Sequence, residues 1–312
     1  MEKQLKVQQL VDNLSKAIVG KDEAIRLVLV ALFAGGHALL EDVPGVGKTL
    51  LAKSLAASIA GKFQRVQCTP DLLPTDITGT NIWNPQKGEF QFLPGPVFAN
   101  ILLADEINRA TPRTQSALLE VMEEGQVTVD GISRNVPSPF FAIATQNPIE
   151  YQGTFPLPEA QLDRFAISFS LGYPNESEEV EMLKRMQLGK VGSAILSPCI
   201  SPEEVIEIRK LCAQIPVSEA ISAYIVNIVR ATRDDAEITL GVSPRGTSAL
   251  FRCVQSYAYI QKMLNSDRQS EYVLPDDVKF LAPYVLGHRI IAAGRRSPKK
   301  IIERLVETIA VP

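Results

Sequence analysis

A short run near residue 45 contains residue types that bind a polyphosphate. It follows an apolar segment, contains two glycines and ends in Lys48-Thr49 at the start of an alanine-rich helical stretch. Glycines let backbone N–H groups curl around phosphate oxygens, and the N-terminus of the next helix adds partial positive charge. Lys48 would reach the β- and γ-phosphates, and the hydroxyl of Thr49 would bind Mg²⁺. The predicted nucleotide-binding residues in this run are Pro44, Gly45, Val46, Gly47, Lys48, Thr49 and Leu50.

One position departs from the usual pattern of such loops, which has a glycine five places before Gly47. This chain has Asp42 there. Asp tolerates left-handed backbone angles better than most residues, so the loop can still form. Read alone, the run could also be a chance Gly-Lys-Thr in a turn.

A second motif supports the phosphate-loop interpretation. The apolar run 98–104 ends in two adjacent carboxylates, Asp105 and Glu106. Such a run suits a strand buried on both faces of a parallel sheet, with its C-terminal end at the ligand crevice. Asp105 is placed to hold Mg²⁺ through water, and Glu106 to polarise an attacking water. The alternative is an ordinary strand that ends in an acidic turn.

Composition and length limit the class of protein. The 312 residues leave room for two domains, each with its own core, and a net charge of −3 gives no signal for nonspecific nucleic-acid binding. The four cysteines are scattered, which indicates a reducing compartment and no structural zinc. The longest hydrophobic stretch, 27–40, is too short to span a bilayer, and the N-terminus does not resemble a signal peptide. We therefore expect a cytoplasmic enzyme without a membrane span.

The order of elements predicts an α/β domain followed by helices. Up to residue 172, helical and strand-like segments alternate, which implies a mostly parallel sheet covered by helices. After the Gly and Pro of 172–175, every periodic segment is helical. The expected division is a nucleotide-binding domain at 1–172 and an all-helical lid at 173–312. The expected strands are 38–41, 63–67, 98–104, 140–145 and 165–170, and the expected helices are 7–16, 22–33, 49–60, 111–124, 177–188, 202–214, 218–233, 244–263, 275–286 and 298–310.

Together these motifs resemble the MoxR branch of the AAA+ ATPases. The resemblance rests on the phosphate loop, on Leu-Ala-Asp-Glu-Ile-Asn-Arg at 103–109, Thr-Gln-Asn-Pro at 145–148 and Ser-Pro-Arg at 243–245, and on segments 84–90, 93–98 and 115–124. It covers the chain from about residue 19 to the C-terminus. It implies an AAA+ P-loop αβα core with a C-terminal all-helical lid, and ATP with Mg²⁺ as cofactors. No guanine-reading motif is evident, which favours ATP.

The resemblance also implies roles for single residues. Asn147 would be the sensor that orients the lytic water, or else an Asn that caps a loop before proline. Arg245 would be the second sensor, which reads the γ-phosphate and couples it to the lid angle, or else a solvent-facing arginine. Val19 and Gly20 would cup the adenine ring, or else they are an apolar entry to a strand.

A trans arginine is implied as well. Arg164 would be the finger that a neighbouring subunit inserts into the site, because a guanidinium binds two phosphate oxygens and stays charged. Arg109 is the competing candidate for this role.

Two segments indicate how the energy would be used. An insert between Asp76 and Phe98 has the only tryptophan, Trp83, and 126–136 has the alternation and Asp-Gly turn of a β-hairpin. In related AAA+ proteins such segments point into a central pore and touch the substrate. Alternatively, Trp83, Phe90 and Phe92 pack under the insert.

The resemblance thus implies an ATPase that remodels or matures client proteins. It would form a homo-oligomer, expected as a hexameric ring, and work with a client and a von Willebrand factor A domain protein, for metal or cofactor insertion or complex assembly. The alternatives are a magnesium-chelatase-like motor subunit, a nucleic-acid motor of the same AAA+ group, and a switch that barely turns over. The acidic chain lacks the basic groove of a nucleic-acid motor, so no nucleic-acid partner is expected.

Overall fold

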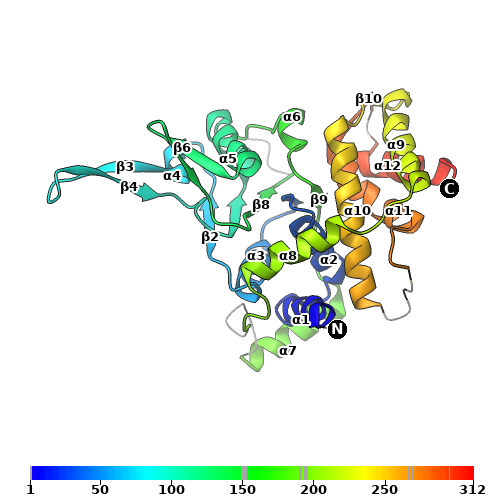
Figure 1. Cartoon of the computed structure of the whole chain (residues 1–312), viewed down its shortest axis with the longest axis horizontal. Coiled ribbons are helices and arrows are strands. Elements are labelled where there is room, and N and C mark those ends of the chain that lie inside the picture. The colour runs from blue at the N-terminus through cyan, green and yellow to red at the C-terminus, as the bar shows by residue number, and fades with distance from the viewer. Residues whose placement is uncertain are drawn as a thin grey trace.

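A parallel sheet with helices on both faces organises the first half of the chain (Figure 1). The structure is a computed structural model that describes residues 2–148, 153–189, 192, 196–265, 268, 270–294 and 296–312. Within these residues, five strands pair in parallel in the order β2, β5, β8, β1, β9. They are β2 (Phe63–Gln67), β5 (Ile101–Asp105), β8 (Phe141–Gln146), β1 (Ala38–Glu41) and β9 (Ile167–Phe169).

Alternate residues of the strands face two different hydrophobic clusters. Leu40 of β1 packs in the cluster of α1 (Glu2–Ala17), α2 (Asp22–Phe33) and α3 (Lys48–Ser58), whereas Leu39 joins that of α5 (Pro112–Glu124). Side chains on a strand point alternately to its two faces, so a strand covered on both sides must be apolar throughout. This explains the uninterrupted apolar run of β5.

A group of helices follows residue 172, and some of them pack against the α/β part. The group consists of α7 (Glu176–Gln187), α8 (Pro202–Ala213), α9 (Glu219–Asp234), α10 (Pro244–Leu264), α11 (Pro275–Leu286) and α12 (Pro298–Thr308). Helix α10 contacts α1, α2 and α8, and one continuous cluster joins these helices to the sheet. The helices of this part of the chain therefore share a hydrophobic cluster with the α/β part. A short antiparallel pair, β10 (Ile238–Leu240) with β11 (Ile291–Ala292), also interrupts the predicted all-helical segment.

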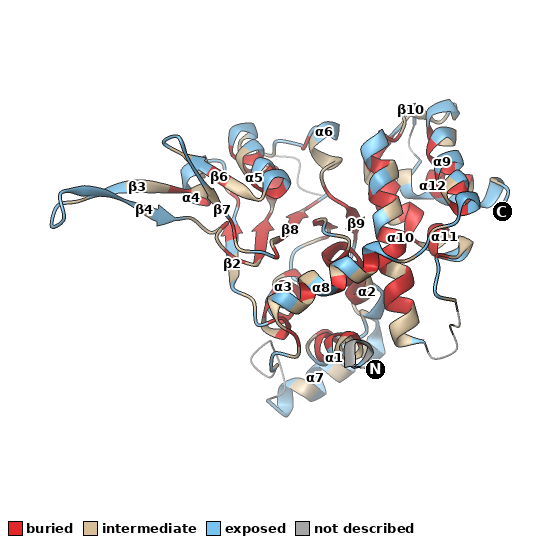
Figure 2. Cartoon of the chain, in the orientation of Figure 1, coloured by how far each residue is buried: buried red, intermediate tan, exposed pale blue. Residues whose placement is uncertain are grey.

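Two hairpins project from the α5 side of the sheet (Figure 1). The first, β3 (Gly79–Asn84) and β4 (Glu89–Pro94), follows the short α4 (Pro74–Thr78), and the second is β6 (Gln126–Val129) and β7 (Ile132–Asn135). Asp130 and Gly131 at the second tip both have positive φ, as the predicted Asp-Gly turn requires. Figure 2 shows that both hairpins are largely exposed.

The short elements α6 (Glu159–Leu162), η1 (Ile107–Arg109) and η3 (Gly287–Arg289) complete the described structure. Among the described residues, no helix combines the length and apolar character that crossing a membrane requires.

Candidate nucleotide-binding site

The predicted phosphate loop lies between the C-terminal end of β1 and the N-terminus of α3. Gly45 and Gly47 have φ of 88° and 102°, which an L side chain rarely adopts, and the space around both is open. Gly47 is the N-cap of α3 and offers no side chain to the first N–H groups of that helix. By contrast, Thr111 caps α5 and Ser243 caps α10. The N-terminus of α3 thus keeps N–H groups available for an anion.

Lys48 and Asp42 hold this loop in shape. Lys48 is buried, and its Nζ donates to the backbone oxygens of Asp42 (2.8 Å) and Val43 (3.1 Å). Asp42 is not among the described non-glycine residues with positive φ, so a left-handed backbone is not the reason for an aspartate here. Its carboxylate instead accepts hydrogen bonds from Ser170, Leu171 and Gly172.

The two predicted carboxylates follow one another at the end of β5. Asp105 accepts hydrogen bonds from the hydroxyl of Thr145 (2.6 Å) and from Arg65 (2.6 Å). The backbone N–H of Glu106 donates to the same hydroxyl (2.9 Å). Glu106 has φ 57° and ψ 51°, a left-handed conformation that is costly for a non-glycine residue and turns its side chain away from the strand direction.

The side chain of Glu106 is engaged on the same edge of the sheet. Gln67, at the end of β2, donates to Glu106 Oε2 (2.9 Å), and so does Arg109 (3.0 Å). Arg109 therefore pairs with the carboxylate of its own chain. A water-activating role for Glu106 would require these two contacts to be released or shared.

The edge formed by the carboxyl ends of the strands brings the predicted ATP-handling residues together. Asn147 follows β8, which lies between β1 and β5, and it is buried. Thr49 is half-buried in the first turn of α3. The hydroxyl of Thr49 and the carboxylate of Asp105 are the hard oxygen ligands that Mg²⁺ prefers, so these residues fit that ion.

A cavity of about 260 Å³ beside the loop suits a purine base. Val19, Gly47 and Leu50, which the sequence assigns to nucleotide binding, are among its lining residues, and its wall also includes Met182 and Met186 of α7. Thioether side chains adapt to flat aromatic surfaces. Sequence reasoning missed this wall, since the exposed methionines of α7 differ little from an ordinary helix surface. Gly20 has φ 69°, packs against Glu178 and is not among the lining residues.

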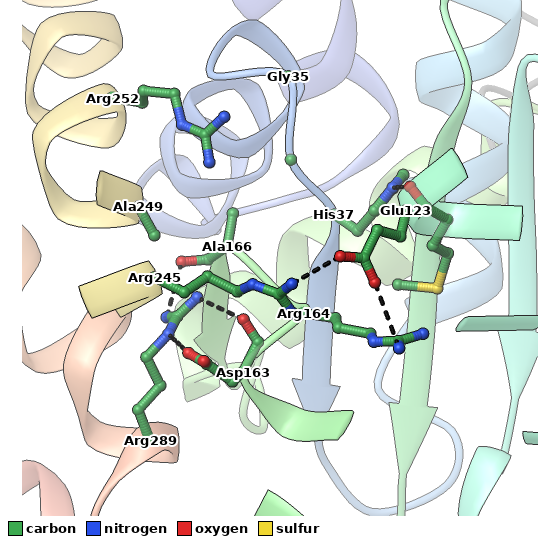
Figure 3. Close-up of a pocket in the computed structure, with 12 residues that line it drawn as sticks. Gly35, His37, Glu123, Asp163, Arg164, Ala166, Arg245, Ala249, Arg252 and Arg289 are labelled. Carbon is green, nitrogen blue, oxygen red and sulfur yellow. Dashed lines mark hydrogen bonds and ion pairs between the residues drawn. The ribbon is translucent and has the colours of Figure 1, made fainter. Parts of the chain in front are cut away.

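The two predicted phosphate-reading arginines lie elsewhere. Arg164 and Arg245 line a second cavity, of about 230 Å³, with Glu123 between them (Figure 3). Glu123 pairs with Arg245 (2.6 Å) and with Arg164 (3.2 Å). Nearby, Asp163 binds Arg289 and accepts a hydrogen bond from Ser243, which ties the start of α10 to the sheet domain.

Strand direction places this arginine cavity at the opposite edge of the sheet. Its lining includes His37, immediately before β1, and Ala166, immediately before β9, whereas the phosphate loop follows the end of β1. The strands are parallel, and a strand of four residues rises about 13 Å. Arg245 therefore lies far from the phosphate loop of its own chain, and its role as the second sensor stays a prediction.

Comparisons with known proteins identify relatives for both halves of the chain. The profile of the ATPase family associated with various cellular activities (AAA) matches residues 37–167, and that of the AAA lid domain matches residues 230–309. The uncharacterized protein YeaC of Bacillus subtilis is 48% identical, over 97% of this chain and 93% of its own length. Chaperone MoxR1 of Mycobacterium tuberculosis is 40% identical, over 98% of this chain and 82% of its own.

A solved structure agrees with the fold. The crystal structure of a candidate ATPase from Cytophaga hutchinsonii superposes with a TM-score of 0.90 at 37% identity, over 99% of this chain and 96% of that one. Phosphate loop, paired carboxylates, helical lid and near-complete alignment with a MoxR chaperone agree with one another. The chain belongs to the MoxR family of AAA+ ATPases.

Proposed function

We propose that the chain hydrolyses Mg-ATP at a site shared by two neighbouring copies and uses the energy to remodel client proteins. The observation that supports a shared site best is the separation of its parts. Lys48 and Glu106 lie at the carboxyl edge of the sheet, whereas Arg164 and Arg245 lie at the opposite edge. In a ring of copies, the arginine edge of one subunit would face the nucleotide of the next.

Within that site the residues have distinct tasks. The N–H groups of the loop and Lys48 bind the β- and γ-phosphates. Thr49, and Asp105 through water, would hold Mg²⁺, which would supply neutralisation of phosphate charge. Glu106 takes up a proton from the attacking water while Asn147 orients it. Arg164 of the neighbour stabilises charge on the transferred phosphoryl group. The position of Arg109 beside its own Glu106 favours Arg164 as the trans finger.

The client-handling part of the proposal rests on the two hairpins. Trp83 and Phe90 lie on β3–β4, exposed by 55% and 69%, with ring centroids 5.2 Å apart. Asn81 of that hairpin donates to Asp130 at the tip of β6–β7 (2.6 Å), so the two hairpins are linked. Exposed aromatic side chains on a projecting hairpin suit contact with unfolded or loosely folded polypeptide.

A hexameric ring, a cytoplasmic setting and a von Willebrand factor A domain partner for metal or cofactor insertion are proposed from family membership alone.

The test is ATP hydrolysis per subunit measured against protein concentration. We expect the specific rate to rise with concentration as copies associate. Glu106→Gln should abolish turnover while ATP binding persists, and Arg164→Ala should lower the rate by about 10³-fold or more with ATP binding intact. Arg113→Ala, an exposed arginine on α5, is the matched control and should leave the rate unchanged. A specific rate that is flat in concentration and unchanged in Arg164→Ala would refute the shared site. If the rate rises with concentration but is lost in Arg109→Ala and unchanged in Arg164→Ala, the finger would be Arg109.

A further inference from the structure

Asp42 stands at the start of the phosphate loop and makes contacts in two directions. Its carboxylate is buried and accepts hydrogen bonds from Ser170 Oγ (2.5 Å), Leu171 N (2.6 Å) and Gly172 N (3.1 Å). Its backbone oxygen accepts the bond from Lys48 Nζ. One residue therefore joins the lysine of the loop to the segment 170–172. A glycine, the usual residue at this place, could make only the second of these contacts.

The segment 170–172 leads directly into the wall of the base cavity. It follows β9 and continues through Tyr173 into α7, the helix that contributes Met182 and Met186 to that cavity. The other side of this connection is held as well, since Lys21 Nζ donates to the backbone oxygen of Tyr173 (2.9 Å). The connection to α7 is thus fastened to the nucleotide pocket at two points.

We propose that Asp42 is a positioning residue that couples the phosphate loop to the connection 170–172 and, through it, to α7. The proposal rests on ATP binding by the loop, as proposed above. Bound phosphates would draw Lys48 Nζ away from the backbone oxygens of Asp42 and Val43, because a charged oxygen is the stronger acceptor. Any shift of Asp42 in response is passed to Leu171 and Gly172, since the carboxylate is their acceptor.

The neighbouring residue offers a matched control. Glu41 joins β1 to β9 through a hydrogen bond from Ser168 Oγ (2.8 Å) and to β8 through one from Gln146 Nε2 (2.6 Å). These contacts lie within the sheet and reach neither Lys48 nor the connection to α7. If Asp42 only fastened the two strands together, Glu41→Gln and Asp42→Asn would have equivalent effects.

The experiment follows amide hydrogen exchange of peptides covering 170–175 in the full chain, with and without Mg-ATP, alongside fluorescent-nucleotide binding and ATPase kinetics. In the wild type, ATP should change exchange at Leu171 and Gly172. Asp42→Asn, which replaces one of the two acceptor oxygens by an NH₂ donor, and Asp42→Gly should exchange faster there and lose the response to ATP. We expect kcat to fall by about tenfold while ATP affinity changes by less than about threefold. Ser170→Ala keeps the carboxylate and should give a partial loss, and Glu41→Gln should respond as the wild type does.

The following outcomes would contradict the proposal. ATP binding by the wild type without a response at 170–172 overturns this inference alone. So does an unchanged response in folded Asp42→Asn and Ser170→Ala, or an equal loss in Glu41→Gln. A wild-type chain that binds no ATP overturns the proposed function together with the inference.

Discussion

At the scale of single residues, Thr145 determines how the two carboxylates are presented. Its fully buried hydroxyl donates to Asp105 and accepts from the N–H of Glu106. The second bond stabilises the left-handed backbone of Glu106, a conformation that by itself costs about 1–3 kcal/mol. One side chain on β8 thus fixes Asp105, the proposed metal-binding carboxylate, and Glu106, the proposed water-activating one, relative to each other.

Replacing Thr145 by Val tests whether this hydroxyl positions Glu106 for catalysis in addition to stabilising the fold. The variant has the same shape but leaves the N–H of Glu106 without its acceptor, at a cost of about 1–3 kcal/mol in the free energy of unfolding. We expect kcat for ATP hydrolysis to drop by about 10²-fold, because Glu106 is no longer held in place. Urea unfolding and steady-state kinetics measure the two effects. Thr145→Ser keeps the hydroxyl and should retain both the unfolding free energy and the kcat of the wild type. A Val variant with wild-type kcat would show that the hydroxyl does not position Glu106.

The sequence was sufficient to predict the phosphate loop and the Asp-Glu pair, but not the residues that hydrogen-bond to the two carboxylates. The loop and the Asp-Glu pair are local patterns, and the structure places both at the same edge of the sheet. Gln67, Arg65 and Thr145 contact the carboxylates from neighbouring strands, so only the strand order reveals them. Asp42 was interpreted through its backbone, whereas its long-range side-chain contacts explain it.

At the scale of elements, prolines and caps made the boundaries predictable. Helices α8 and α10 begin at the predicted Pro202 and Pro244, each after a serine that caps the helix. Strands 38–41 and 63–67 and helices 22–33 and 275–286 also have the bounds expected from the sequence. Proline fixes φ in a first helical turn, and Ser or Thr before it accepts from the free N–H groups, so both signals mark a helix start locally. The pair β10–β11 was missed because two- and three-residue strands form only through pairing with each other.

The hairpin β3–β4 resolves part of the ambiguity about its aromatic residues. Trp83 and Phe90 are exposed, but Phe92 is half-buried against Phe98 and beneath the guanidinium of Arg134, which lies 4.1 Å from its ring centroid. Packing under the insert therefore describes Phe92, while Trp83 and Phe90 remain available to a partner.

These positions should respond differently to truncation. We expect Trp83→Ala and Phe90→Ala to lower client-stimulated ATPase activity by about tenfold or more, with less than about 1 kcal/mol lost in unfolding free energy, because neither ring is buried. Phe92→Ala should instead cost about 2–4 kcal/mol, since it empties packed volume. Thermal or urea unfolding, with client-stimulated ATPase normalised to folded protein, makes the comparison. Destabilisation by Trp83→Ala without loss of client response would reject the pore-contact role.

At the scale of the whole molecule, strand direction sets which functional groups one chain can combine. Parallel strands put every carboxyl end at one edge, so a loop after β1 and an arginine before β9 are necessarily apart. The packing of α10 on α1 and α2 was beyond sequence reasoning, because an apolar helix face does not identify the partner that covers it.

The two histidines of the chain have lowered pKa values and should make the whole fold sensitive to acid. His37 accepts the N–H of Ala142 at Nδ1 (3.0 Å) and contacts the backbone oxygen of Met122 through Nε2 (2.8 Å), which joins β1, β8 and α5, and burial lowers its pKa to about 4. Burial also lowers the pKa of His288 well below its usual value, with further lowering from Arg289.

The direction of the pH dependence of stability follows from how many protons the folded and the unfolded chain bind. Below the unfolded-state pKa near 6.5, the unfolded chain binds protons that folded His37 does not, so the stability conferred by the neutral ring is lost as pH falls from about 6.5 toward 4. For His37 alone we expect a loss of about 2 kcal/mol in unfolding free energy between pH 7 and pH 5. Urea unfolding at both pH values measures it, and His37→Gln should show a smaller loss by about that amount, although its stability at pH 7 is lower. Carboxylates titrate in both proteins and cancel in the comparison. Equal pH dependence in the two proteins would mean that His37 is protonated as readily in the folded chain as in the unfolded one, which its burial and its contacts with Ala142 and Met122 argue against.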